Sequence, residues 1–220
     1  MTDPYDVTPR NRVRQLKDKA AYERDVVHAI LDAALVAHVG FVQDGVPVVV
    51  PMIYGRDGET LFLHGARKAR VIRMLEQTKQ ACVNVTLVDA LVLARSAFNS
   101  SLNYRSVTLF GRPLLVEDRD AKLHALHTIS EHTMPGRWAE LREPLEKEIK
   151  MTGVIRLAIE SASAKVAAGM PDDEPADYDT PVWAGILPLE SAFTQLVPDD
   201  ELRGGVEPSA AVRDLQRRRL

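Results

Sequence analysis

The stretch of sequence that decides the fold joins an apolar strand to a cationic helix. It reads Leu61-Phe62-Leu63-His64-Gly65-Ala66-Arg67-Lys68-Ala69-Arg70-Val71-Ile72. The apolar run predicts a buried strand, and Val71, Ile72 and Leu75 predict a helix over 68–77 with one face toward the core. Small residues between the two let the backbone approach a ligand, and amides at a helix start attract anions. The junction therefore predicts a turn that can hold a phosphate.

Two apolar, β-branched runs lie upstream of this junction. Residues 35–42 and 46–54 predict strands, and Gln43-Asp44-Gly45 between them has the composition of a hairpin turn. A third strand is expected over 60–64. Ahead of these strands, apolar residues at helical spacing predict an amphipathic helix over 20–34.

Two longer strand patterns lie downstream. Residues 81–93 predict a strand in which Val88-Asp89-Ala90 is a candidate break. Residues 105–116 predict another, with Gly111 as a bulge and Pro113 as the mark of an edge strand.

The last third of the chain is more helical and more polar. We expect helices over 119–132 and 138–150 and a strand over 153–160. An acidic, proline-bearing loop follows over 170–180, and the chain becomes a polar tail from residue 198.

Five to seven strands joined by tight turns, with helices at a few connections, predict a mainly β (α+β) fold. The expected architecture is an antiparallel barrel with peripheral helices. The turns are too short for parallel crossovers, and no Gly-x-Gly-x-x-Gly follows a strand, which argues against a Rossmann domain. We expect one domain over residues 1–220, with terminal extensions at 1–19 and 198–220 around a core of about 20–197.

Composition narrows the classes of function. The chain has 220 residues, is 45% hydrophobic and carries a net charge of -3, so it has no global field that would attract nucleic acid or an anionic membrane. It has one cysteine, Cys82, which suits a reducing compartment. No segment approaches the roughly 18 to 20 apolar residues of a membrane span. We expect a cytoplasmic protein.

Several motifs in one order carry a family resemblance. They are the strand that ends Val50-Pro51-Met52-Ile53-Tyr54, the segment Leu61–Ala66, the strand Asn103-Tyr104-Arg105-Ser106-Val107-Thr108-Leu109-Phe110-Gly111, and Trp183-Ala184-Gly185-Ile186-Leu187-Pro188. Over residues 22–196 the chain resembles the flavin-nucleotide-binding proteins related to pyridoxamine 5'-phosphate oxidase, especially the branch that includes nitroimidazole reductases. The resemblance implies an antiparallel split β-barrel homodimer with FMN at the subunit interface.

The same resemblance implies roles for the residues of the junction. The segment that begins Gly65-Ala66 is similar to the oxidase's Gly-Ser-Arg-Lys-Ala, whose cations hold the FMN phosphate. Arg67 and Lys68 are therefore the first candidates for that role, and Arg70 is the alternative. His64 either faces flavin and substrate, as a catalytic residue, or caps the turn between strand and helix.

Further cofactor contacts are implied outside the junction. The main chain of Val50, Pro51 and Met52 would contact the flavin ring, because these side chains are apolar. Ser106 stands where the oxidase has a flavin-contacting Gln, and Tyr104 and Arg105 flank it. Trp183 is either a plug in the core or dimer interface or a cofactor contact.

Two departures from the oxidase argue against pyridoxamine phosphate as the substrate. Residues 48–54 lack the Arg and Lys of the oxidase's flavin strand, and Phe193-Thr194-Gln195-Leu196 is not followed by its basic sequence. A doubly charged phosphate normally needs several fixed cations.

The implied function is an FMN-dependent oxidoreductase that takes a hydride from NADH or NADPH and reduces a small molecule. A non-catalytic flavin carrier or sensor stays open, as does a barrel repurposed for haem or a deazaflavin. His124, His127 and His132 have a spacing similar to that of metal ligands, yet no carboxylate or cysteine completes a set, so no metal site is expected.

Overall fold

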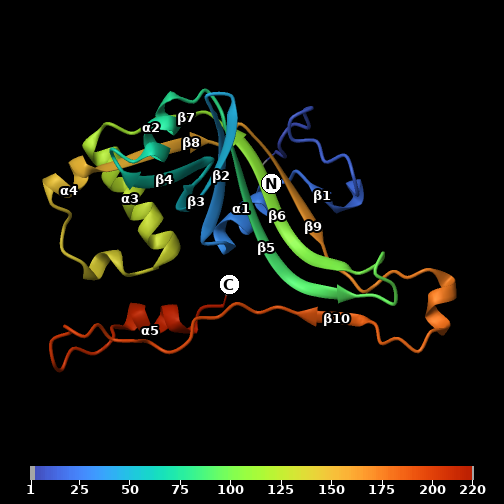
Figure 1. Ribbon diagram of the computed structural model, residues 1–220. Coiled ribbons are helices and arrows are strands. Elements are labelled where there is room, and N and C mark those ends of the chain that lie inside the picture. The colour runs from blue at the N-terminus through green and yellow to red at the C-terminus, as the bar shows by residue number, and fades with distance from the viewer. Residues whose placement is uncertain (1–2, 220) are drawn as a thin grey trace. The chain divides into compact units, whose positions relative to one another are not determined.

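The computed structural model describes residues 3–219, which form two compact units. The first unit comprises the chain up to Pro51 with residues 80–112 and 159–189, and the second comprises residues 52–79, 113–158 and the chain from Glu190. Figure 1 shows the elements of each unit. No helix within residues 3–219 is long and apolar enough to cross a membrane.

The first unit is an antiparallel sheet with one helix against it. Its strands are β1 (Ala20–Ala21), β2 (Val36–Gln43), the first half of β3 (Val46–Asp57), β5 (Ala81–Leu93), β6 (Ser101–Gly111), β9 (Ser161–Ala167) and β10 (Gly185–Pro188). The strand order is β1-β9-β6-β5-β2-β3, and β10 also pairs with β5. Helix α1 (Arg24–Ala33) contacts β5, β6 and β9 and buries Val27, Ile30 and Leu31. The spacing of these three residues explains why this segment is helical.

The hairpin turn between β2 and β3 is confirmed. Asp44 and Gly45 have φ angles of 51° and 78°. Positive φ at both central residues is the geometry of a type I′ turn, which Asp-Gly adopts at low cost.

The second unit places helices on both faces of a smaller antiparallel sheet. Its elements are the second half of β3, β4 (Thr60–Ala66), β7 (Pro113–Leu115), β8 (Thr152–Ala158), α2 (Arg70–Gln77), α3 (Arg119–Thr133), α4 (Glu146–Met151) and α5 (Ala210–Arg217). The strand order is β3-β4-β8-β7. Phe62 packs in a cluster with Ala125 and Ile129 of α3, whereas Leu61 and Leu63 alternate with it and are fully buried. Cover on both faces explains why three consecutive apolar residues occur in β4.

A glycine sets the closeness of α3 to the sheet. A Cβ atom at Gly55 would lie 2.7 Å from the backbone of Thr128 and Ile129. Only glycine fits there without displacing the helix.

The structure corrects several expectations about strands. The described residues form ten strands rather than five to seven. No break occurs at Val88-Asp89-Ala90; β5 continues to Leu93 and Asp89 is the extra residue of a bulge, since Val88 pairs with Tyr104 and Ala90 with Asn103. Gly111 ends β6 and is not a bulge, whereas the edge position of Pro113 in β7 is confirmed.

Strand β9 is the longest strand absent from those expected from the sequence. It reads Ser161-Ala-Ser-Ala-Lys-Val-Ala, and these mostly small residues have weak strand preference. The strand forms because it pairs with β6 on one side and β1 on the other.

Two helix predictions also need correction. The expected helix over 20–34 begins only at Arg24, because β1 occupies Ala20–Ala21. The expected helix over 138–150 is a 3-10 turn at Trp138–Glu140 and the separate helix α4. Pro144 lies between them, and the residue before a proline is disfavoured in helical conformation.

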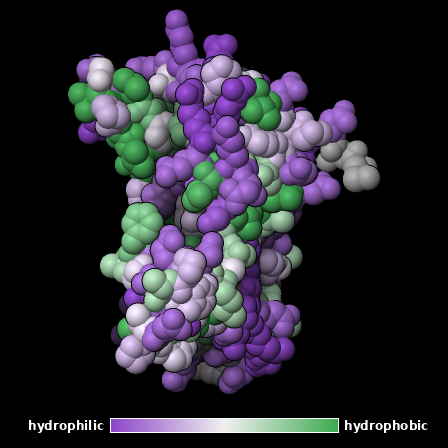
Figure 2. Space-filling model, turned by 90° about the vertical axis from the view of Figure 1, so that its right-hand side faces the viewer, coloured by the Kyte–Doolittle hydropathy of each residue, from purple (hydrophilic) through white to green (hydrophobic). Residues whose placement is uncertain are grey.

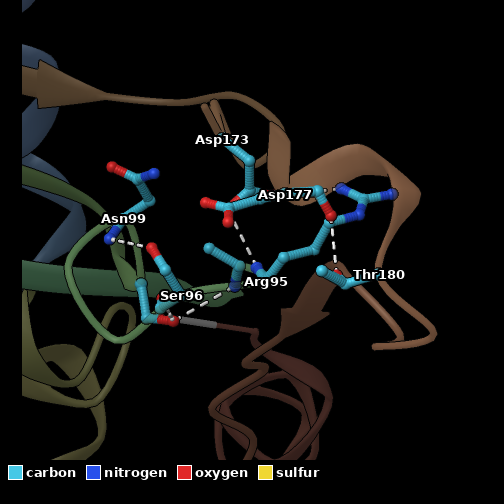
Figure 3. A network of polar contacts seen from close by, with 8 residues as sticks. Arg95, Ser96, Asn99, Asp173, Asp177 and Thr180 are labelled. Carbon is cyan, nitrogen blue, oxygen red and sulfur yellow. Dashed lines mark hydrogen bonds and ion pairs between the residues drawn. The ribbon is translucent and has the colours of Figure 1, made fainter. Parts of the chain in front are cut away.

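The acidic loop after β9 is anchored by a polar network (Figure 3). The Asp173 carboxylate accepts hydrogen bonds from the backbone N–H of Arg95 at 2.9 Å and from its guanidinium at 3.1 Å. The Arg95 guanidinium also lies over the ring of Tyr178, 4.7 Å from its centroid. The loop that leads into β10 is therefore fixed to the connection between β5 and β6.

The C-terminal tail folds back on the second unit. Gln216 donates to the carbonyl of Thr194 at 3.0 Å, and Arg218 donates to the carbonyl of His132 at 3.2 Å. This polar tail contains the helix α5, whose N-cap is Ser209. With residues 137 and 140, the tail lines a pocket of about 760 Å³.

Candidate functional site

The turn between β4 and α2 is built on two facing glycines. Gly65 in β4 pairs with Gly153 in β8. A Cβ atom at Gly153 would lie 2.6 Å from the Ile72 side chain, so this close packing of α2 requires glycine. The junction predicted from the sequence is thus a tight strand-to-helix turn.

Helix α2 begins at Arg70, two residues later than expected. Its N-cap, Ala69, supplies no side-chain cap, and the first hydrogen bond of the helix runs from the Arg73 N–H to the Ala69 carbonyl at 3.2 Å. Uncapped amides at a helix start are suited to an anion. Lys68 and Arg70 are exposed beside them.

Arg67 has a different environment from the other two cations. Its guanidinium donates two hydrogen bonds to Glu76 in the last turn of α2, at 3.1 and 3.2 Å. Sequence reasoning missed Glu76, because nine positions separate it from Arg67 and no helical spacing joins them.

His64 lies on β4 opposite Val154 and is half-buried. Its Nδ1 is buried and has no hydrogen-bond partner in the described part of the chain. Burial lowers the pKa of His64 below its ordinary value. Burial therefore favours the neutral imidazole and leaves one ring nitrogen as a buried polar atom without a partner among residues 3–219.

The other histidines of the second unit have partners. His124 is hydrogen-bonded to Asp57 at 2.9 Å, and the ring of His127 meets Trp138 edge-on at 5.6 Å. The ring of His132 lies 4.7 Å from that of Tyr54. Within residues 3–219, no group of three His, Cys, Asp or Glu side chains could hold a metal ion.

The expected flavin contacts outside the junction are found in both units. Met52 is buried and belongs to the second unit. The first unit holds Val50 and Pro51 in β3 and Tyr104 and Ser106 in β6. The Ser106 hydroxyl contacts the Lys165 carbonyl at 3.5 Å. Tyr104 and Ser106 are both half-buried.

Arg105 is fixed by the bulge residue Asp89. Its Nε and Nη2 atoms donate to the Asp89 carboxylate at 3.0 and 2.7 Å. This hydrogen bonding raises the pKa of Arg105. Asp89 was expected only as part of a turn, and its position in a bulge explains how the carboxylate reaches the neighbouring strand.

Trp183 is 69% exposed in the chain. Its ring lies against Gly185, where a Cβ atom would come within 2.8 Å of it. The interpretation of Trp183 as a core plug is wrong, because the indole covers the start of β10 rather than entering the core.

Known proteins match this chain over most of its length. The model of the family "Pyridoxamine 5'-phosphate oxidase" matches residues 23–166. The flavocytochrome Anf3 from Azotobacter vinelandii is 37% identical, with a TM-score of 0.88 over 94% of this chain and 96% of its own. A FAD- and haem-binding protein from Mycobacterium smegmatis is 35% identical, with a TM-score of 0.87 over 90% of this chain and 98% of its own.

A third structure shares the fold alone. It is a putative 5-nitroimidazole antibiotic resistance protein from Bacteroides thetaiotaomicron, 24% identical with a TM-score of 0.58 over 67% of this chain and 86% of its own. Among curated proteins no significant match was found. The antiparallel split barrel with peripheral helices is confirmed. The chain belongs to the pyridoxamine 5'-phosphate oxidase family.

Proposed function

We propose that this chain is a redox protein that binds both a flavin and a haem. The observation that carries the proposal is the similarity, over at least 90% of the chain, to a flavocytochrome and to a FAD- and haem-binding protein. The family match ends at residue 166, whereas these two similarities extend into the C-terminal segment. Haem, one of the alternatives left open by the sequence, thereby gains support.

The start of α2 fits the phosphate of a flavin nucleotide. Its amides have no side-chain cap within residues 3–219, and Lys68 and Arg70 stand next to them. Amide dipoles and fixed cations together stabilise a phosphate more than either alone. The close approach allowed by Gly65 and Gly153 keeps this turn in place.

The flavin ring would lie along the main chain of Val50, Pro51 and Met52. Their apolar side chains leave only amides and carbonyls for hydrogen bonding to the ring. Arg105 is a further candidate for a flavin contact, and its orientation is set by the ion pair with Asp89.

His64 is the residue of the junction that would hold a haem iron. Neutral imidazole is the form that ligates haem iron, and burial, which lowers the pKa of His64, favours that form. Its buried, unpartnered Nδ1 is the feature that a ligand or a proton donor would satisfy. The alternative role for His64 is to move a proton at the flavin or substrate.

Flavin when bound would supply hydride acceptance and haem iron one-electron transfer. The chain's residues bind and orient these groups and need supply no nucleophile. We expect NADH or NADPH as the electron source and a small molecule as the acceptor if the protein turns over. A carrier without turnover is the alternative.

We further propose that the protein works as a homodimer. Val42, Val46 and Val49 in β2 and β3 are 62%, 59% and 64% exposed, and such apolar strand surface is usually covered. Light scattering would report twice the chain mass if the proposal holds and the single-chain mass of 24.4 kDa if it fails.

The first test is the visible spectrum of the purified protein with mass identification of the released chromophores. A Soret band together with two broad flavin bands supports the proposal. If protein purified from cells supplied with haem shows flavin bands alone, the haem part of the proposal is refuted. A colourless protein that binds neither added flavin nor added haem would refute the proposed function as a whole.

His64→Ala separates the two roles of His64. If His64 holds the haem iron, the variant loses the Soret band and keeps its flavin. If it handles protons only, the Soret band persists and NAD(P)H-dependent turnover falls. His124→Ala, whose partner is Asp57, serves as the control and should leave both spectra unchanged.

A further inference from the structure

The pocket of about 760 Å³ in the second unit lies between the C-terminal tail and the 3-10 turn Trp138–Glu140. Pockets that enclose small molecules commonly measure about 300 to 1,000 Å³ and are lined mainly by apolar side chains. None of the residues that line this pocket belongs to the junction or to the other flavin candidates. Its ligand is therefore a question separate from that of the flavin.

One wall of the pocket is formed by the start of α5, which is fixed to the turn. The Ser209 hydroxyl accepts the N–H of Val212 at 3.3 Å and donates to the Glu140 carboxylate. A Cβ atom at Gly136 would lie 3.2 Å from the Ala211 side chain, so helix and turn approach closely. The wall is held by hydrogen bonds and packing and does not depend on a ligand.

The opposite wall is a loop of the tail with exposed apolar side chains. An antiparallel bridge between Ala192 and Arg219 closes this loop. Val197, Leu202 and Val206 line the pocket and are 88%, 48% and 51% exposed. Apolar side chains gathered on one concave surface are typical of a site that binds a ligand.

The charged residues of the lining leave the pocket without an unpaired cation. Arg137 donates to the Glu140 carboxylate at 2.7 Å. The hydrogen bond from Ser209, together with that from Arg137, lowers the pKa of Glu140, so the carboxylate is charged at neutral pH. Glu207, the third charged residue of the lining, is exposed to solvent. An anionic ligand would therefore find no net positive charge here.

The guanidinium of Arg137 can still recognise a polar group. It carries five N–H donors, and its bond to Glu140 uses one of them. A carbonyl oxygen can accept from the same guanidinium without disturbing the ion pair. The pocket thus combines apolar walls with a hydrogen-bond donor whose charge is balanced.

We propose that this pocket binds a small, uncharged apolar molecule that carries a carbonyl oxygen. The apolar walls would hold the body of the molecule, and Arg137 would donate to its carbonyl. Glu140 sets the specificity, because its carboxylate balances the charge that would otherwise attract carboxylates and phosphates. This site goes beyond the proposed flavin and haem function and does not depend on it.

The test compares three probes that share one aromatic body and differ in charge: naphthamide, naphthoate and naphthylmethylammonium. Their binding to the full chain is measured by equilibrium dialysis. The neutral amide should bind about tenfold more tightly than either ion, which is the difference that about 1.4 kcal/mol makes. A preference for the cation would assign the pocket to Glu207 and overturn the inference.

Glu140→Gln tests the role assigned to Glu140. The substitution removes the negative charge and leaves that of Arg137 unbalanced, so the affinity for naphthoate should rise about tenfold, as expected for one charge-assisted hydrogen bond. Glu146→Gln is the control, because it frees Arg119 from a similar pair at 2.8 Å outside the pocket. No gain in Glu140→Gln, or an equal gain in both variants, would contradict the role of Glu140.

Leu202→Arg tests the location, since the new side chain would fill the pocket and abolish binding of naphthamide. Leu189→Arg is the matched control: Leu189 is 55% exposed, similar to Leu202, and does not line the pocket. Equal losses in the two variants, or no binding of naphthamide to the native chain, would overturn the inference. Flavin and haem spectra of the same samples report on the proposed function separately.

Discussion

Two arginine–aspartate pairs in the first unit use the same chemistry in different surroundings. In the Arg95–Asp173 pair the Asp173 side chain is fully buried and that of Arg95 is 23% exposed. In the Arg105–Asp89 pair the side chains are 38% and 34% exposed. Water can hydrogen-bond to both side chains of the Arg105–Asp89 pair and screens their attraction. In the Arg95–Asp173 pair, water reaches only part of the Arg95 side chain.

The difference separates an anchor from an orienting contact. Asp173 would be a buried, unpaired charge without Arg95, so this pair holds the loop before β10 in place. Asp89 lies in a bulge of β5 and its main effect is to fix the direction of Arg105. Burial therefore decides whether such a pair contributes to stability or to the geometry of a site.

The largest effect is expected from Asp173→Ala. Removing the carboxylate leaves the Arg95 guanidinium and backbone N–H without their acceptor, which should cost about 3 kcal/mol of unfolding free energy. Urea unfolding measures this change. Asp172→Ala, an exposed neighbour, is the control, and a loss as small as that of the control would break the comparison.

A smaller effect is expected from Asp89→Ala. An exposed pair of this kind contributes about 0.5 kcal/mol, so urea unfolding should change little. Flavin affinity should fall if Arg105 loses its orientation. A stability loss as large as that of Asp173→Ala would show that exposure does not separate the two pairs.

The smallest effect concerns an exposed pair in the second unit and depends on pH. The hydrogen bond from Arg142 lowers the pKa of Glu148 from 4.5 to about 2. Since the folded state holds the carboxylate charged, its stabilisation is present above pH 4.5 and is lost as the pH falls toward 2. Glu148→Gln should flatten the acid side of the stability curve within that window, as measured by thermal unfolding from pH 2 to 6. An unchanged curve would contradict the pair's contribution.

Much of the candidate site could be predicted from the sequence because its signals are local. The tight turn at Gly65 and the start of α2 follow from residue types within a few positions. The partners of Arg67 and Arg105 could not be predicted in this way. Glu76 is not at a helical spacing from Arg67, and Asp89 reaches Arg105 on the neighbouring strand only because it lies in a bulge of β5.

The sequence by itself determined the apolar strand β4, the type I′ turn at Asp44-Gly45 and the helical faces of α1 and α2, because periodicity and turn chemistry act between near neighbours. Only the tertiary structure decided that Ser161–Ala167 is a strand, that Asp89 bulges, and that Arg95 meets Asp173 across 78 positions. The strand, the bulge and the ion pair all depend on a partner segment that is distant in the sequence. Backbone hydrogen bonds and buried charges need partners that are close in space, whatever their separation along the chain.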